Sequence, residues 1–141
     1  MDMPRTALVV VDHGSRLPES GTVLLRVVEA IRATGRYHFV AGAHMDLEQP
    51  SLHAALETCF SQGAERVVIV PFMLAPGRHS SEDIPRLARE AFPQAPEGQI
   101  LVAQPLGDHP GVIQAVLDAA EGATGSCSPP ALLRVETSAL L

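Results

Sequence analysis

Two histidines lie in closely similar surroundings, His13 within DHGSR and His79 within PGRHSS. Each follows a run of apolar, β-branched residues and has a glycine and an arginine within three residues. A neutral imidazole binds divalent metal ions and accepts protons near neutral pH. We therefore expect His13 and His79 to form one site, in which they act as metal ligands and proton acceptors.

Arginine and serine side chains flank both histidines: Arg16 and Ser15 near the first, Arg78 and Ser80 near the second. A guanidinium group pairs with carboxylates or phosphates through two parallel hydrogen bonds. The HGSR segment lacks the glycine spacing of a phosphate-binding loop. No G-x-S-x-G elbow surrounds Ser15, so a covalent hydrolase is not indicated. We predict that these four residues bind an anionic substrate.

The four other histidines differ in position. His44 ends a predicted strand, so we expect it to contact the substrate as well. His109 precedes Pro110 at the start of a predicted helix, where a capping role is expected. His38 and His53 are expected on the surface.

Two carboxylates lie close in sequence to the candidate histidines. Asp12 precedes His13, and Asp83 follows His79 after three intervening residues. A carboxylate that accepts the second ring N–H of a metal-binding histidine holds that ring in position. For Asp83 the favoured alternative is a cap on the following helix.

Short apolar runs alternate with longer amphipathic segments along the chain, which is typical of βα units. Four such units predict an α/β fold, a three-layer sandwich with a four-stranded parallel sheet. In such sheets ligands bind beyond the carboxyl ends of the strands. The predicted strands are 6–12, 37–44, 66–72 and 99–105, and the predicted helices are 19–34, 50–62, 80–92 and 109–122.

The character of the chain changes after Gly122. We expect one domain over 1–122, followed by a linker and short tail over 123–141. The linker contains ATGSCSPP, and the tail, ALLRVETSALL, is apolar. Whether the tail pairs as an edge strand or packs on a partner is left open.

Composition excludes several classes of protein. The net charge is −6 and aromatic residues make up 4%, which argues against nucleic acid as a partner. No uninterrupted apolar run reaches the roughly 18 residues of a membrane span, and the N-terminus lacks a signal-peptide pattern. A soluble, cytoplasmic protein is therefore expected. Cys59 and Cys127 form no C-x-x-C pair, which is compatible with a reducing compartment.

Four segments carry a family resemblance: VVVDHGSRLPES, AHMDLEQPSL, QGAERVVIVPFMLAPGRHSSEDIPRLAREA and PLGDHPGV. Together they resemble the short-form sirohydrochlorin chelatases, a branch of the class II tetrapyrrole chelatases, over roughly residues 6–120. The most specific motif is P-G-R-H-x-x-x-D-I-P. The resemblance implies a chelatase-like α/β fold, a homodimer, and insertion of a divalent metal ion into sirohydrochlorin. It also implies that the active-site histidines are His13 and His79.

The chain departs from the family pattern in three places. Asp46 stands where relatives often have glutamate, which shortens the carboxylate. Ser80 and Ser81 stand where relatives commonly have an aromatic residue after the second histidine. Gly21 and Thr22 replace a common asparagine. The serines are expected to open the cleft or to change the substrate contacts.

Metal insertion requires that a divalent ion lose water, reach one face of the macrocycle and displace two pyrrole N–H protons. Two imidazoles bind Fe²⁺ or Co²⁺ tightly enough to capture the ion and loosely enough to release it, and either can accept a proton. Sirohydrochlorin is a polycarboxylate, so we expect Arg16 and Arg78 to bind its carboxylates, helped by Ser15, Ser80 and His44. Fe²⁺ is the favoured substrate ion and Co²⁺ the next, and no organic cofactor is expected.

Two other functions fit the same residues. One is a protein that carries a metal or a tetrapyrrole without turnover, and the other is a nickel chelatase. Two histidines do not distinguish between these ions, because affinity order and cellular supply decide which one binds. Whether the active site is shared between subunits, and whether a transit peptide was removed, also stays open at this point.

Overall fold

The computed structural model describes residues 3–15, 17–45 and 49–125, and at residues 18, 20, 79 and 80 it describes the backbone alone. The chain divides into two compact units, Met1–Gly107 and Asp108–Leu141. The described elements are, in chain order, β1 (Thr6–Asp12), α1 (Pro18–Ala33), β2 (Phe39–His44), α2 (Leu52–Ser61), β3 (Arg66–Pro71), the π-helical turn η1 (His79–Asp83), α3 (Ile84–Ala91), β4 (Ile100–Val102) and α4 (Pro110–Thr124).

The first unit contains a parallel sheet of four strands in the order β2-β1-β3-β4. β1 pairs with β2 up to Asp12 opposite His44, and with β3 up to Val11 opposite Pro71. A parallel sheet that is covered on both faces requires strands that are apolar on both sides. Residues 7–11 of β1 are all buried, which meets this requirement. The predicted α/β class and the four-stranded parallel sheet are confirmed.

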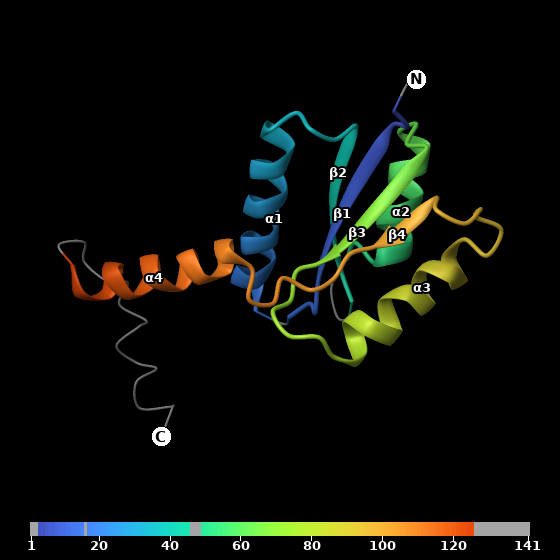
Figure 1. Cartoon of the computed structure of the whole chain (residues 1–141). Helices are drawn as coiled ribbons and strands as arrows, with labels where there is room; N and C mark the ends of the chain where they lie inside the picture. The colour runs from blue at the N-terminus through green and yellow to red at the C-terminus, as the bar shows by residue number, and fades with distance from the viewer. Residues whose placement is uncertain (1–2, 16, 46–48, 126–141) are drawn as a thin grey trace. The chain divides into compact units, whose positions relative to one another are not determined.

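Helices pack on both faces of this sheet, with α1 on one face and α2 and α3 on the other (Figure 1). On the α1 face, Leu24 and Val28 of the helix pack on strand side chains. A Cβ added at Gly42 would lie 3.2 Å from an atom of each of these two residues, so the glycine lets α1 lie close to β2. The larger core, on the α2 and α3 face, includes Val9, Val11, Leu56, Cys59, Ile69 and Ile84.

Three strands are shorter than the sequence predicts, and of these β3 ends at Pro71 rather than at residue 72. β2 begins at Phe39 rather than at residue 37. β4 spans Ile100–Val102 rather than 99–105, and it pairs with β3 over three residues. Among the described residues β4 has a neighbouring strand on one side only. Just beyond β4, the N–H of Ala103 still donates to the carbonyl of Ile69 at 2.8 Å.

The helix predicted over 80–92 begins one residue earlier, as the π-helical turn η1, and becomes α-helical at Ile84. Pro85 has no N–H to donate to the carbonyl of Ser81, so the regular α-helical ladder is interrupted there. Ser81 anchors the turn, because its N–H and its Oγ both donate to the carbonyl of Gly77, at 2.9 and 2.7 Å. His79, expected in the loop before the helix, is instead the first residue of this turn.

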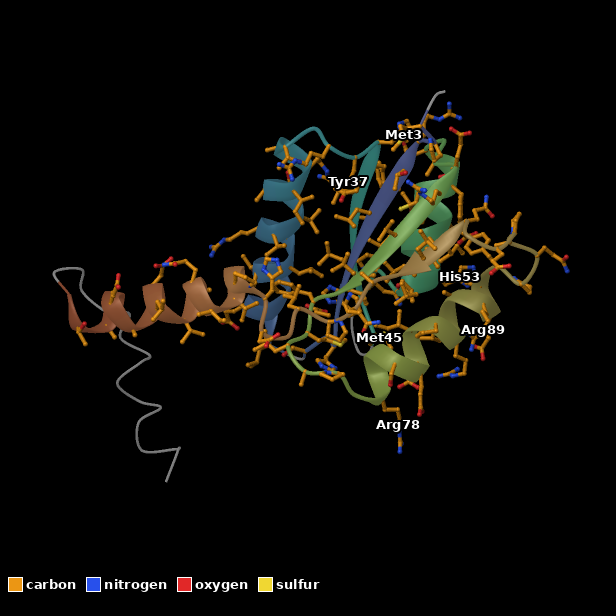
Figure 2. The ribbon with its side chains drawn as sticks, in the orientation of Figure 1. Met3, Tyr37, Met45, His53, Arg78 and Arg89 are labelled. Carbon is orange, nitrogen blue, oxygen red and sulfur yellow. The ribbon has the colours of Figure 1, made fainter. Side chains whose placement is uncertain are left out.

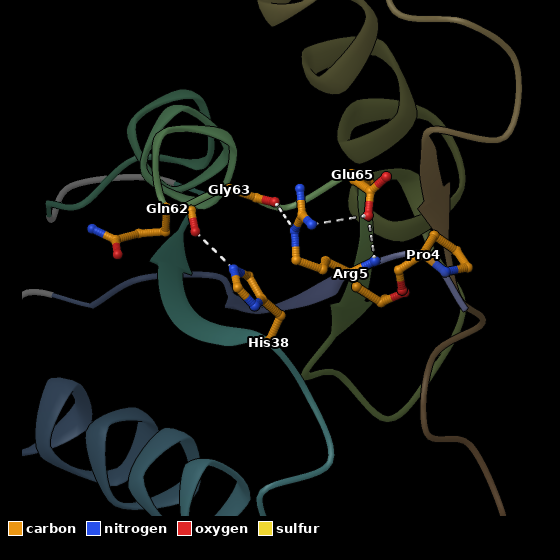
Figure 3. Close-up of polar contacts among 7 residues, drawn as sticks. Pro4, Arg5, His38, Gln62, Gly63 and Glu65 are labelled. Carbon is orange, nitrogen blue, oxygen red and sulfur yellow. Dashed lines mark hydrogen bonds and ion pairs between the residues drawn. The ribbon is translucent and has the colours of Figure 1, made fainter. Parts of the chain in front are cut away.

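The opposite edge of the sheet, at the amino ends of the strands, is tied to the turn after α2 (Figure 3). Arg5 donates from Nε to the carbonyl of Gly63 at 2.8 Å, and its backbone N–H donates to Glu65 Oε1 at 3.0 Å. His38 Nε2 lies 2.7 Å from the carbonyl oxygen of Gln62 and donates to it, because a carbonyl only accepts. His38 is exposed, as predicted, and its bond supports the fold.

The second unit contains α4. His109 Nδ1 accepts the N–H of Gly111 at 2.9 Å, which confirms its predicted capping role. α4 runs to Thr124 rather than ending at Gly122. The tail from residue 126 lies outside the described residues, so its packing and the predicted boundary between 1–122 and 123–141 stay predictions. In the described ranges no helix has the length and apolar character needed to cross a membrane.

Candidate functional site

The carboxyl ends of β1, β2 and β3 lie side by side at one edge of the sheet, because the three strands are parallel neighbours. Each end leads to a candidate residue. His13 follows β1, His44 is the last residue of β2, and the 72–78 loop leads from β3 to His79. The fold thus brings the backbones of these three histidines to the edge where open α/β sheets bind ligands.

The turn after β1 is shaped by a carboxylate. Asp12 Oδ1 accepts the N–H of Gly14 at 2.9 Å, and Gly14 has a φ of 86°, which a residue with a side chain rarely adopts. Ser15 Oγ accepts the N–H of Leu17 at 3.0 Å. His13 lies within this turn and is exposed. The turn therefore presents an imidazole to solvent from a backbone of defined shape.

The same carboxylate binds the imidazole of His44. Asp12 Oδ1 and His44 Nδ1 are 2.6 Å apart, and the two residues are directly opposite each other in the strand register. Because a carboxylate accepts, Nδ1 carries the hydrogen and donates it. His44 is 6% exposed, and its backbone N–H donates to the carbonyl of Pro50 at 2.9 Å. His44 thus has a fixed orientation, and its contact with substrate stays a prediction.

The loop after β3 is anchored where it begins. The Phe72 N–H donates to the carbonyl of Val11 at 2.6 Å, and the carbonyl of Met73 accepts the N–H of Leu106 at 2.9 Å. Met73 is buried in the core. Residues 74–78 are exposed, and the Arg78 side chain points away from the sheet (Figure 2). The guanidinium group of Arg78 is therefore accessible to a ligand.

Part of the predicted site lies outside the described residues. This holds for Arg16 and Asp46, and for the side chains of His79 and Ser80. The structure brings the backbone of His79 to the same edge as His13, while the contact between the two imidazoles stays a prediction.

Asp83 does not cap α3 with its side chain, so that expectation is wrong. Its backbone is already helical, with φ −69° and ψ −45°, because η1 continues directly into α3. The Asp83 carboxylate instead lies 3.5 Å from Arg86 Nη2. Glu90, and then Asp83, raise the pKa of the exposed Arg86 guanidinium, which therefore stays charged on the helix surface.

Sequence reasoning paired Asp12 with the adjacent His13 and missed its bond to His44, 32 residues away. The available signal was that Asp12 and His44 both end predicted strands. That signal indicates a contact only once the two strands are known to be neighbours in register.

Small hollows lie near the histidine edge. One of about 200 Å³, between α2 and α3, is lined in part by His44, Met45 and Leu87. Another of about 220 Å³ lies between the segments that follow β3 and β4. A larger cavity of about 560 Å³ lies between α3, β4 and the 93–98 segment, and no histidine lines it. None of the candidate residues that the structure describes lines this larger cavity.

The CbiX family model matches residues 7–123 of the chain. The chain is similar to the chloroplastic sirohydrochlorin ferrochelatase of Arabidopsis thaliana, with 40% identity over 79% of this chain and 49% of the plant protein. It is also similar to the sirohydrochlorin cobaltochelatase of Methanopyrus kandleri, with 30% identity over 84% of this chain and 97% of the archaeal protein.

Among solved structures, the chain resembles the sirohydrochlorin chelatase SirB from Bacillus subtilis subspecies spizizenii in complex with cobalt. The TM-score is 0.77 at 25% identity, over 84% of this chain and 51% of the SirB chain. The chain thus spans about half the length of the plant protein and of SirB, and nearly all of the archaeal protein.

Proposed function

The chain belongs to the CbiX family, and from this we propose that it inserts a divalent metal ion into sirohydrochlorin. The curated relatives described above are a ferrochelatase and a cobaltochelatase of that tetrapyrrole. The observation that carries the proposal is the common sheet edge of His13 and His79, which follow the neighbouring parallel strands β1 and β3.

In the proposed reaction the metal ion and the tetrapyrrole are both substrates. The divalent ion exchanges bound water for the imidazoles of His13 and His79. It then passes to the four ring nitrogens as two pyrrole N–H protons leave, so the net charge is conserved. Two histidines bind such an ion, but more weakly than the four nitrogens of the macrocycle, so the ion can transfer to the macrocycle. The imidazole that gives up the metal can accept a departing proton.

Charge supports the assignment of the substrate contacts. The protein has a net charge of −6 and sirohydrochlorin is a polycarboxylate, so binding requires local positive charge. Arg78, the residue before η1, is exposed and is suited to this role, and Arg16 is assigned the same role from its place in the sequence. Ser15, Ser80 and His44 complete the proposed set of substrate contacts.

Fe²⁺ is the ion that we propose as the physiological substrate, with Co²⁺ next. The resemblance to plant-type ferrochelatases favours iron, although imidazole ligands accept either ion. We further propose a homodimer, to be tested by the mass in solution, and a cytoplasmic location.

The test is an anaerobic optical assay with sirohydrochlorin and Fe²⁺, Co²⁺ or Ni²⁺. We expect insertion well above the spontaneous rate, and a fall in kcat of about 100-fold or more in His13→Ala and in His79→Ala. His38→Gln is the matched control, because His38 lies at the opposite edge of the sheet and glutamine can still donate to the Gln62 carbonyl.

Full activity in both alanine variants would refute the catalytic roles. Binding of sirohydrochlorin with only the spontaneous rate of insertion would identify a carrier instead. The ion that is inserted fastest at equal free concentration would identify the metal specificity.

A further inference from the structure

Asp12 joins the two strand ends that border the candidate site. Its Oδ1 accepts Nδ1–H of His44 at 2.6 Å and the N–H of Gly14 at 2.9 Å. Its backbone carbonyl accepts the N–H of Met45 at 2.9 Å. This one residue therefore ties the turn that carries His13 to the end of β2.

His44 is the fixed end of this network. It is 6% exposed, its N–H donates to the Pro50 carbonyl, and it forms a parallel bridge with Ser51. The buried imidazole of His44 donates its Nδ1–H in a fixed direction, and this hydrogen bond fixes the position of Asp12 Oδ1. The same oxygen accepts the Gly14 N–H and so fixes the position of that amide.

His13 lies between the two residues that the Asp12 to Gly14 bond joins. The bond favours the φ of 86° at Gly14, because glycine adopts many other conformations at low cost. Without the bond, we expect the backbone on both sides of His13 to move, and the imidazole to move with it. The contacts of Asp12 thus act on His13 through the turn.

We propose that Asp12 and His44 are positioning residues that hold the turn of His13 in the conformation that captures the metal ion. The inference rests on the proposed function, since it takes His13 to be a metal ligand. One carboxylate oxygen accepts both N–H groups, so we expect the position of this oxygen to matter more than its negative charge. Loss of residues that orient metal ligands typically weakens metal binding by about 10–100-fold.

The test measures the binding of Co²⁺ alone, from its visible absorption on the protein, beside insertion into sirohydrochlorin. Asp12→Ala is expected to weaken Co²⁺ binding by about 10–100-fold and to lower kcat, with little change in the KM for sirohydrochlorin. Asp12→Asn should stay within about threefold of wild type, because an amide oxygen can accept both N–H groups. Glu57→Ala is the matched control, since it removes the exposed pair of a carboxylate with His53 at 3.8 Å.

Unchanged Co²⁺ affinity in Asp12→Ala would overturn the inference. Equal damage in Asp12→Asn would also overturn it, because charge would then matter more than geometry. His44→Phe should weaken Co²⁺ binding as Asp12→Ala does, and unchanged Co²⁺ affinity in His44→Phe would refute its positioning role.

Far-UV circular dichroism identifies any variant that fails to fold. Hydrogen exchange at the Gly14 amide gives a measurement that needs no metal. We expect protection in wild type and its loss in Asp12→Ala, and an unprotected Gly14 amide in wild type would refute the inference.

The two proposals fail in different ways. A wild-type protein that binds Co²⁺ but inserts no metal would refute the proposed function and leave the positioning role standing. Normal insertion and Co²⁺ binding in Asp12→Ala would refute the positioning role alone. A wild type that binds no Co²⁺ and inserts no metal would refute both.

Discussion

The thiol of Cys59 is expected to be almost unreactive in the folded protein. Cys59 is fully buried between α2 and the sheet, and burial raises the pKa of its thiol from 9.0 to about 11. The thiolate is the form that alkylating reagents attack. At about pH 8 a thiol with a pKa of 9.0 is roughly one-tenth ionised, and one with a pKa near 11 roughly one-thousandth. Iodoacetamide should therefore modify Cys59 at least about 100-fold more slowly in the folded protein than in urea.

The same shift makes stability depend on pH. Above about pH 9 the unfolded chain begins to lose the thiol proton, while the folded state keeps it up to about pH 11. The unfolded state then binds fewer protons, so the free energy of unfolding falls as pH rises. The contribution is fully present below about pH 9 and is lost as the pH rises through about 11. A shift of about two pKa units corresponds to about 3 kcal/mol.

Urea unfolding between about pH 8 and pH 11 measures this effect. Cys127→Ser leaves Cys59 as the one cysteine of the sequence, and the comparison protein carries Cys59→Ala in addition. The other titrating groups are common to both proteins and cancel in the difference. We expect the stability difference to fall by about 2 kcal/mol over this range, because the folded thiol is only about half ionised at pH 11. A difference that stays constant, or alkylation of folded Cys59 as fast as in urea, would refute the reasoning.

Three further predictions concern the fold. Ile69 is fully buried in β3, so Ile69→Ala should lower the free energy of unfolding by about 2–5 kcal/mol and Ile69→Val by about 0.5–1.5 kcal/mol; equal losses in urea unfolding would contradict the packing described. Gly63 has a φ of 92°, so Gly63→Ala should cost about 1–2 kcal/mol, whereas Gly122→Ala, inside α4 and with no atom near the added Cβ, should raise helix content. A Gly63→Ala protein as stable as wild type, or unchanged circular dichroism in Gly122→Ala, would contradict these backbone arguments. His109→Ala removes the cap of α4 and should cost about 0.5–1.5 kcal/mol of helix stability, read as faster amide exchange at Gly111; unchanged exchange would show that the cap contributes nothing.

Local patterns were sufficient to predict most of the elements. β1 has the predicted bounds, because an uninterrupted apolar run of β-branched residues is a signal that needs no partner to be recognised. α1 and α2 end close to the predicted residues, since glycines follow both. The common edge of His13 and His79 also follows from the sequence. Parallel strands that are joined by helices all have their carboxyl ends at the same side of the sheet.

Other features depended on neighbours that only the folded chain supplies. β4 spans three residues because its pairing with β3 ends at Val102, and its own apolar sequence does not reveal where that pairing ends. The helix after β3 begins with a π-helical turn at His79. Ser81 bonds this turn to Gly77, and Pro85 interrupts the α-helical hydrogen bonds that would follow. Each of these outcomes depends on contacts between residues outside the local pattern.

The tertiary structure alone decided what Asp12 binds. The sequence places Asp12 beside His13, whereas the strand register places it opposite His44, 32 residues away. The register follows from packing, because Val11 and Ala43 must be buried together on one face of the sheet. Successive residues of a strand point to opposite faces, and residues opposite each other in neighbouring strands point to the same face. The side chain of Asp12 is therefore directed toward His44.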